Sequence, residues 1–312
     1  MRVALVGIGA IGRAWAISFL RAGHEVRIWN RSPDRVDEAR ALIEAILPDL
    51  HRANLLGGRD PRDLMAHLSS HAALEEAVDG AGHVQESVAE DVAVKRALFA
   101  DLDRLAPGDA VLASSTSGIV ASRFSDHLER PERVLVAHPL NPPYLVPAVD
   151  IVPSPRTAPE CVARTAAFMR GCGQVPILMD REDPGFVTIR LQGMMYHACW
   201  QIVASGLADP ESVDVAVREG LGLRWSFIGP FETADLNAPN GIRQFVDIFG
   251  ADLAALYPKD GPVEWAGSLM DRVERHRREV LPMEEHRARQ LWRDRRLIAL
   301  AAHRAAQDRK DG

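Results

Sequence analysis

Val3-Ala4-Leu5-Val6-Gly7-Ile8-Gly9-Ala10-Ile11-Gly12 is an apolar run that breaks at glycine and then continues as a helical pattern. The spacing of Gly7, Gly9 and Gly12 is typical of the turn between the first strand and helix of a dinucleotide-binding βαβ unit. There the first glycine permits a tight turn, the second lets the backbone approach a pyrophosphate, and the third lets helix and strand pack closely. We expect the following helix, residues 11–20, to direct its N-terminal amides at the phosphates.

A second apolar run, residues 25–30, ends where a dinucleotide fold places the residue that binds the adenosine ribose. That residue is Asn30, which lacks the negative charge with which an acidic residue repels a 2′-phosphate. Arg31, Ser32 and Arg35 follow, and guanidinium and hydroxyl groups suit a phosphate. Alternatively, both arginines are solvated surface charges and Asn30 bonds the ribose hydroxyls. The absence of a negative charge at Asn30 and the presence of these arginines favour NADP(H) over NAD as the cofactor.

Composition excludes several classes of protein. The chain has 312 residues, enough for two domains, and its net charge of −6 argues against a general nucleic-acid binder. Met1 leads directly into the first apolar run, and no apolar stretch approaches the roughly 18 residues of a membrane span. Three widely spaced cysteines form neither a disulfide framework nor a zinc site, so we expect no metal and a cytoplasmic location.

The pattern of apolar runs predicts two domains. Up to residue 184, short apolar runs alternate with amphipathic stretches, which is typical of a doubly wound, mostly parallel Rossmann-type sheet. From 185 to 312 helical periodicity dominates, which predicts an all-α domain for substrate binding and dimerisation. The expected strands are 2–7, 25–30, 83–88, 110–114, 133–137, 149–153 and 175–179, and the expected later helices are 186–206, 210–219, 241–256, 262–280 and 283–306.

Polar residues cluster where strands of this sheet would end. His138 stands at such an end beside a proline-rich loop, and Asp150, twelve residues on, can orient its ring. A histidine oriented by a carboxylate is a general base, which is what hydride transfer from an alcohol requires. Ser117 and Asn141 can donate hydrogen bonds to the substrate oxygen. In the alternative interpretation the serines cap a turn and His138 is a satisfied polar residue.

Six motifs in order make the chain similar to the 3-hydroxyacyl-CoA dehydrogenase superfamily, especially its λ-crystallin or L-gulonate 3-dehydrogenase branch. They are GIGAIG, VQESVAED with Lys95, SSTSG, AHPLNPP, DPGFVTIRL and GPFE, and the resemblance as a whole covers residues 2 to about 300. The resemblance implies an NAD-linked cytoplasmic enzyme, usually a homodimer, that oxidises a 3-hydroxy acid or thioester. It further implies site residues: a phosphate loop of Gly7, Gly9, Ile11 and Gly12, cofactor contacts from Glu90 and Lys95, the base His138, and substrate contacts from Ser117 and Asn141.

Three positions depart from the family pattern. Asp150 stands where a glutamate usually orients the histidine, so the pair needs a closer backbone or a bridging water. Ile189 replaces a substrate-binding asparagine and cannot donate a hydrogen bond. Asn30 stands where NAD-specific relatives carry aspartate.

These observations predict an NAD(P)-dependent dehydrogenase that oxidises the 3-hydroxyl of a small polar hydroxy acid, with L-gulonate the first candidate. A carnitine-type or CoA-thioester substrate is an alternative, and so is a catalytically weak structural protein like the lens crystallins. Arg224 can clamp a free carboxylate, which a thioester lacks, or it can form a helix-end or interface salt bridge.

Overall fold

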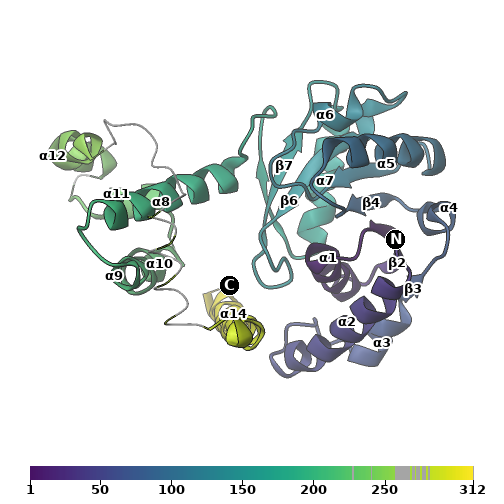
Figure 1. Cartoon of the computed structure of the whole chain (residues 1–312), viewed down its shortest axis with the longest axis horizontal. Helices are drawn as coiled ribbons and strands as arrows, with labels where there is room; N and C mark the ends of the chain where they lie inside the picture. Colours follow the sequence, from purple (N-terminus) through teal and green to yellow (C-terminus); the bar gives the residue numbers. More distant parts are fainter. Residues whose placement is uncertain are drawn as a thin grey trace. The chain divides into compact units, whose positions relative to one another are not determined.

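The computed structural model describes residues 1–226, 228–239, 241–256, 268, 271, 275, 279 and 282–311. It contains two compact units, Met1–Arg190 with Ala288–Gly312, and Leu191–Arg287. The first is an α/β unit and the second is helical (Figure 1). None of the described helices is long and apolar enough to cross a membrane.

The first unit is built on one eight-stranded sheet with the order β3-β2-β1-β4-β5-β6-β7-β8. Neighbouring strands are parallel except for β6 and β7, which run antiparallel. The doubly wound, mostly parallel sheet is therefore confirmed. The strands are β1 (Arg2–Val6), β2 (Glu25–Trp29), β3 (Leu68–Ser70), β4 (His83–Glu86), β5 (Val111–Ser114), β6 (Val134–Pro139), β7 (Ala148–Pro153) and β8 (Val175–Leu178).

Helices cover both faces of the sheet, which is why β1, β5 and β6 contain apolar runs without alternation. In β1, Val3 and Leu5 belong to one buried cluster, while Ala4 and Val6 belong to the cluster on the opposite face. The first face carries α1 (Ala10–Arg21), α2 (Asp34–Arg52), α3 (Pro61–Ala66) and α7 (Pro159–Gly171), and the other carries α4 (Leu74–Val78), α5 (Val92–Leu105) and α6 (Ser122–Ser125) (Figure 1).

One helix of the helical unit begins where the sequence predicts it, at Pro210. Asp209 caps the helix that begins at Pro210, because its carboxylate accepts a hydrogen bond of 2.7 Å from the Ser212 amide. The predicted helix 262–280 lies almost wholly outside the described residues. The helices are α8 (Val187–Ala204), α9 (Pro210–Val215), a π-helical turn (Ala216–Leu221), α10 (Gly222–Trp225), α11 (Pro230–Leu236) and α12 (Ile242–Ala255).

The last helix, α14 (His286–Asp311), corrects the predicted organisation. The sequence places residues 185–312 in the helical domain, but from Ala288 onward the chain belongs to the α/β unit. The reason is apolar packing: Ile298 is buried in the core cluster on the α1 face, with Leu297 and Ala301 against it. The division between the units falls inside α8, whose first turn remains with the sheet.

A buried histidine lies in the middle of this core. His83, on β4, is 1% exposed and stacks on Phe168 with ring centroids 4.3 Å apart. Its Nε2 is 3.0 Å from the side-chain oxygen of Gln85, while its Nδ1 has no hydrogen-bond partner among the residues that the structure describes. Burial lowers the pKa of His83 from 6.5 to about 4, so the ring is neutral in the folded protein at neutral pH.

We expect His83 to make the fold acid-sensitive. Between pH 6.5 and pH 4, His83 is protonated in the unfolded chain but neutral in the folded chain. The free energy of unfolding therefore falls as the pH drops through this range, and at pH 5 it is lower by about 2 kcal/mol. In His83→Gln this part of the loss should disappear, as measured by urea unfolding at pH 7 and pH 5. His67→Gln, at an exposed position, is the control. An unchanged pH dependence in His83→Gln would contradict the assignment.

Candidate active site

The glycine loop has the sterics of a nucleotide cradle. Gly7 has φ +93°, and a Cβ there would lie 2.6 Å from the Ser87 carbonyl oxygen. A Cβ on Gly12 would lie 2.1 Å from the Gly7 carbonyl oxygen, so strand and helix approach too closely for any side chain. A Cβ on Gly9 would meet nothing within 4 Å. Gly9 therefore faces open space, as expected where a pyrophosphate lies against the backbone.

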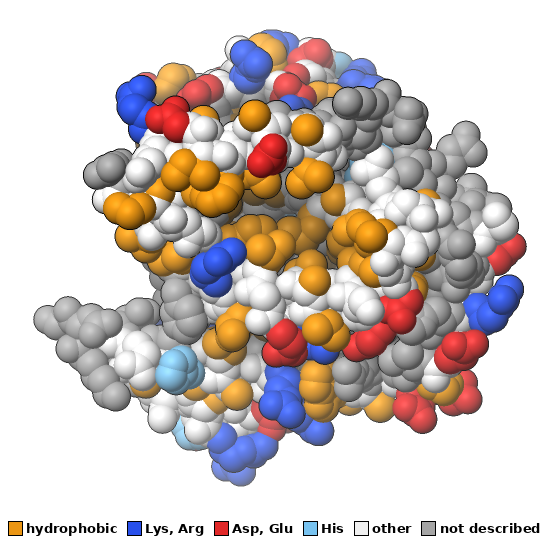
Figure 2. Space-filling model, turned by 90° about the vertical axis from the view of Figure 1, so that its left-hand side faces the viewer, with side chains coloured by type: hydrophobic (Ala, Val, Ile, Leu, Met, Phe, Trp, Pro, Cys, Tyr) orange, Lys and Arg blue, Asp and Glu red, His pale blue; other side chains and the backbone are white. Residues whose placement is uncertain are grey.

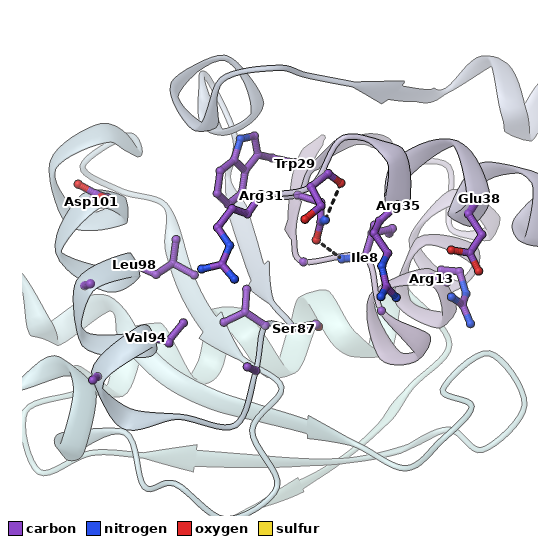
Figure 3. Close-up of a pocket in the computed structure, with 18 residues that line it drawn as sticks. Ile8, Arg13, Trp29, Arg31, Arg35, Glu38, Ser87, Val94, Leu98 and Asp101 are labelled. Carbon is purple, nitrogen blue, oxygen red and sulfur yellow. Dashed lines mark hydrogen bonds between the residues drawn. The ribbon is translucent and has the colours of Figure 1, made fainter.

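A cavity of about 830 Å³ opens over this loop (Figure 3). Its volume is in the range of cofactor sites. Two of the predicted cofactor residues, Arg31 and Arg35, line this cavity (Figure 3). Arg13 lines it as well, although no sequence motif indicates a role for it. Its walls are Gly7, Ile8, Gly9, Arg13, Trp29, Asn30, Arg31, Ser32, Arg35, Glu38, Ser87, Val88, Ala89, Ala93, Val94, Ala97, Leu98 and Asp101. The residues present fit a dinucleotide.

Asn30 joins the glycine loop to the segment that follows β2. Its Oδ1 accepts from the Ile8 amide at 3.4 Å, and its Nδ2 donates to the Ser32 carbonyl at 2.9 Å. The first bond is available to an aspartate, but the second requires an amide because a carboxylate has no proton to donate. The amide therefore fixes the path of the chain through Ser32.

Glu90 and Lys95 take part in a polar cluster beneath the loop after β5. Lys95 is 1% exposed, and its Nζ donates to both oxygens of Glu86, at 2.8 and 2.9 Å. Glu90, whose side chain is 47% exposed, accepts hydrogen bonds from the amides of Ser117 and Gly118 and from the Thr116 hydroxyl. Burial raises the pKa of Glu90, but these hydrogen bonds and the Lys95 charge together hold it below its usual value. The cluster thus keeps a carboxylate beside Ser117.

His138 and Asp150 form the predicted pair. They lie directly opposite each other on the antiparallel strands β6 and β7, so their side chains share one face. His138 Nδ1 lies 3.1 Å from Asp150 Oδ2, and the side chains are 5% and 0% exposed. The shorter aspartate therefore reaches the ring directly, without a bridging water. Among the described residues Nε2 makes no hydrogen bond, which leaves it for a substrate proton.

Two further residues complete the surroundings of the histidine. The Phe186 ring lies against the imidazole, with centroids 5.6 Å apart. The Thr188 hydroxyl binds Asp150 Oδ2 and lies 3.5 Å from His138 Nδ1. Thr188 could not be identified from the sequence, because no pattern shows which residue of DPGFVTIRL approaches a strand residue 38 positions earlier.

The other predicted substrate residues lie in three places. Ser117 and Asn141 are exposed in loops that follow the adjacent strands β5 and β6, at the edge of the sheet that carries the glycine loop. Ile189 is half-buried in the first turn of α8, next to Thr188. Arg224 is exposed on α10 of the helical unit. The roles of these residues in binding substrate stay predictions.

Such a loop and such a histidine–carboxylate pair on one sheet edge define a nucleotide-dependent oxidoreductase. The family model of the 3-hydroxyacyl-CoA dehydrogenase NAD-binding domain matches residues 2–183, and that of the C-terminal domain matches residues 185–276. The chain belongs to the 3-hydroxyacyl-CoA dehydrogenase family.

Relatives with two different names match most of the chain. The chain is 40% identical to a lambda-crystallin homolog of Bos taurus over 96% of its length and 94% of the relative. It is 39% identical to an L-carnitine dehydrogenase of Streptomyces coelicolor over 87% of its length and 85% of the relative. Among solved structures, an NAD+-dependent FHMPC 5-dehydrogenase superposes with a TM-score of 0.82 at 25% identity, covering 96% of each chain.

Two glycine substitutions separate folding from cofactor binding. Gly12→Ala should lower the melting temperature and abolish binding, because its methyl group collides with the Gly7 carbonyl. Gly9→Ala should leave the melting temperature within about 2 °C of wild type, because the added methyl group contacts no other atom of the protein. It should weaken binding of NAD+ and NADP+ at least tenfold, because the methyl group occupies the position where the pyrophosphate would lie against the backbone. Thermal unfolding and calorimetric titration measure both. If Gly9→Ala bound the cofactor with wild-type affinity, the glycine loop would not be the pyrophosphate-binding site.

Proposed function

We propose that this protein is an NAD(P)-dependent dehydrogenase that oxidises the 3-hydroxyl group of a small polar hydroxy acid, with an L-gulonate-like acid as the first candidate. The observation that carries the proposal is the direct His138–Asp150 hydrogen bond at the sheet edge shared with the glycine loop. A protein kept only for cofactor binding or for a structural role has no use for this buried pair.

In the proposed reaction each residue has one task. Ser117 and Asn141 donate hydrogen bonds to the substrate oxygen. His138 Nε2 accepts the hydroxyl proton, while Asp150 keeps the Nδ1 proton in place and stabilises the imidazolium that forms. The glycine loop and the cavity over it would hold a nicotinamide cofactor, which would supply the hydride acceptor. In the reverse direction protonated His138 returns the proton to the oxygen.

Arg224 supports a free acid over a CoA thioester, and Ile189 favours a substrate that presents carbon over one that presents a hydroxyl or a thioester oxygen. Arg224 is exposed on α10 and can form a bidentate contact with a carboxylate, a group that a thioester lacks. Ile189 presents carbon where the family pattern has an asparagine, so the pocket loses one polar contact. L-carnitine is the second candidate, because it also carries a carboxylate and a 3-hydroxyl, and because relatives named L-carnitine dehydrogenase are 39% identical. Arg224 does not distinguish these two acids.

The cofactor is proposed to be NADP(H). Three guanidinium groups, those of Arg13, Arg31 and Arg35, line the cavity against two carboxylates, those of Glu38 and Asp101. The uncharged amide of Asn30 stands where an acidic residue would repel a 2′-phosphate. The opposing consideration is the NAD-binding description of the family domain.

A homodimer formed through the helical unit is also proposed. Apolar side chains gather on the face shown in Figure 2, and several on α10, α11 and α12 are more than half exposed. An exposed apolar surface of this extent is typical of a protein interface. The mass in solution, set against 34.3 kDa for one chain, tests this proposal. The residues are Leu223, Phe231, Leu236, Val246, Ile248 and Leu253.

The proposed location is the cytoplasm. All three cysteines are free thiols in the structure. Burial raises the pKa of Cys161 to about 11 and that of Cys172 to about 12, so neither is a reactive thiolate at neutral pH. A chain without disulfides suits a reducing compartment.

Replacement of His138 tests the activity. His138→Ala should lower kcat on L-gulonate or L-carnitine at least 100-fold and leave the Kd of the cofactor within about twofold of wild type, because only the proton acceptor is lost. Absorbance at 340 nm follows turnover, with 3-hydroxybutyryl-CoA in the substrate panel. His127→Ala, an exposed histidine on the same unit, is the control. A variant that keeps more than about a tenth of wild-type turnover removes His138 from this role.

Cofactor choice is decided by kcat/KM with NAD+ and NADP+. We expect NADP+ to be preferred, Arg31→Gln to lower kcat/KM for NADP+ about tenfold with little effect on NAD+, and Asn30→Asp to move preference toward NAD+. Arg62→Gln, at an exposed position of α3, is the matched control. A preference of wild type for NAD+ above tenfold contradicts the assignment.

A further inference from the structure

We infer that Thr188 is a positioning residue for the acid–base pair: its hydroxyl holds the Asp150 carboxylate in the orientation that keeps His138 Nε2 free for the substrate. This inference rests on the proposed function for its kinetic consequences. The structural part, which concerns only the three side chains, stands on the geometry of the protein without substrate.

The Asp150 carboxylate has few partners for its degree of burial. The side chain is 0% exposed, and within the described part of the chain its Oδ1 has no hydrogen-bond partner. Both donors that reach it, His138 Nδ1 and Thr188 Oγ1, converge on Oδ2. Since a buried carboxylate depends on hydrogen bonds to remain charged and fixed, Thr188 supplies one of its two restraints.

The bond has only one chemically sensible direction. An ionised carboxylate accepts but never donates, so the Thr188 hydroxyl must give its single proton to Asp150. Its oxygen then lies 3.5 Å from His138 Nδ1, on the side of the ring that Asp150 already occupies. Asp150 Oδ2 is thereby directed at Nδ1, which favours the tautomer with the proton on Nδ1 and the lone pair on Nε2.

No other charged side chain bonds this ring in the described part of the chain. Asp150 reaches it from β7, while Phe186 and Thr188 reach it from the segment that begins α8. Loss of the Thr188 hydroxyl concentrates the carboxylate's charge on its one remaining donor. The imidazolium form of His138 is then stabilised, and its protonation should move to higher pH.

The test uses Thr188→Val, which keeps the branched shape and removes the hydroxyl, beside Thr188→Ser, which keeps the hydroxyl. In the whole protein we expect kcat to fall about tenfold in Thr188→Val, with cofactor KM unchanged. The acid limb of the kcat/KM profile should move up by at least half a pH unit. Thr188→Ser should restore turnover to within about threefold of wild type.

A second measurement does not need turnover. Nuclear magnetic resonance of ¹⁵N-labelled histidine reports the His138 tautomer and its titration, with the His138→Ala spectrum providing the assignment. We expect the Nδ1–H tautomer in wild type and Thr188→Ser, and titration at higher pH in Thr188→Val. An unmoved or lowered titration in Thr188→Val, or equal turnover in the Val and Ser variants, overturns the role of Thr188. If no hydroxy acid is oxidised by wild type, the proposed function fails, while the titration still decides the positioning.

Discussion

The close approach of Gly12 to the Gly7 carbonyl oxygen is the constraint on which the rest of the α/β unit depends. With only 2.1 Å between that oxygen and the position of a Cβ, nothing larger than hydrogen lets α1 pack against the end of β1. This packing turns the helix N-terminus toward the sheet edge where β4, β5 and β6 also end. The cavity, the Glu90 cluster and the His138 pair are all built on that edge.

Local sequence predicted the parts of the fold that local physics decides. The sequence pattern identified seven of the eight strands, and in β1, β5 and β6 burial on both faces leaves a continuous apolar stretch. The missed strand, β3, has three residues, of which only Leu68 is buried. Equally, no pattern revealed that α14 returns to the first unit, since Ile298 packs against residues that lie far away in the chain.

Site residues could be predicted from the sequence where the residue type itself indicates a chemical role. They could not be predicted where a role depends on which residues the fold brings into contact. His138 and Asp150 were found because a histidine and a carboxylate flank a proline-rich loop. Thr188 and Glu86 were not, because a threonine in a helix and a glutamate in a strand signal nothing until their partners are known. Their importance follows from Asp150 and Lys95, each almost fully buried.

The antiparallel pairing of β6 and β7 has a consequence for how this enzyme can diversify. His138 faces Asp150 because the ladder between the two strands sets their alignment, with Ala137 opposite Ile151 and Pro139 opposite Val149. The connecting loop, residues 140–147, does not set it. Insertions or deletions in that loop can therefore change the surroundings of the site without separating His138 from Asp150. Evolution, or a designer, can vary the loop while the alignment of the two side chains is inherited unchanged.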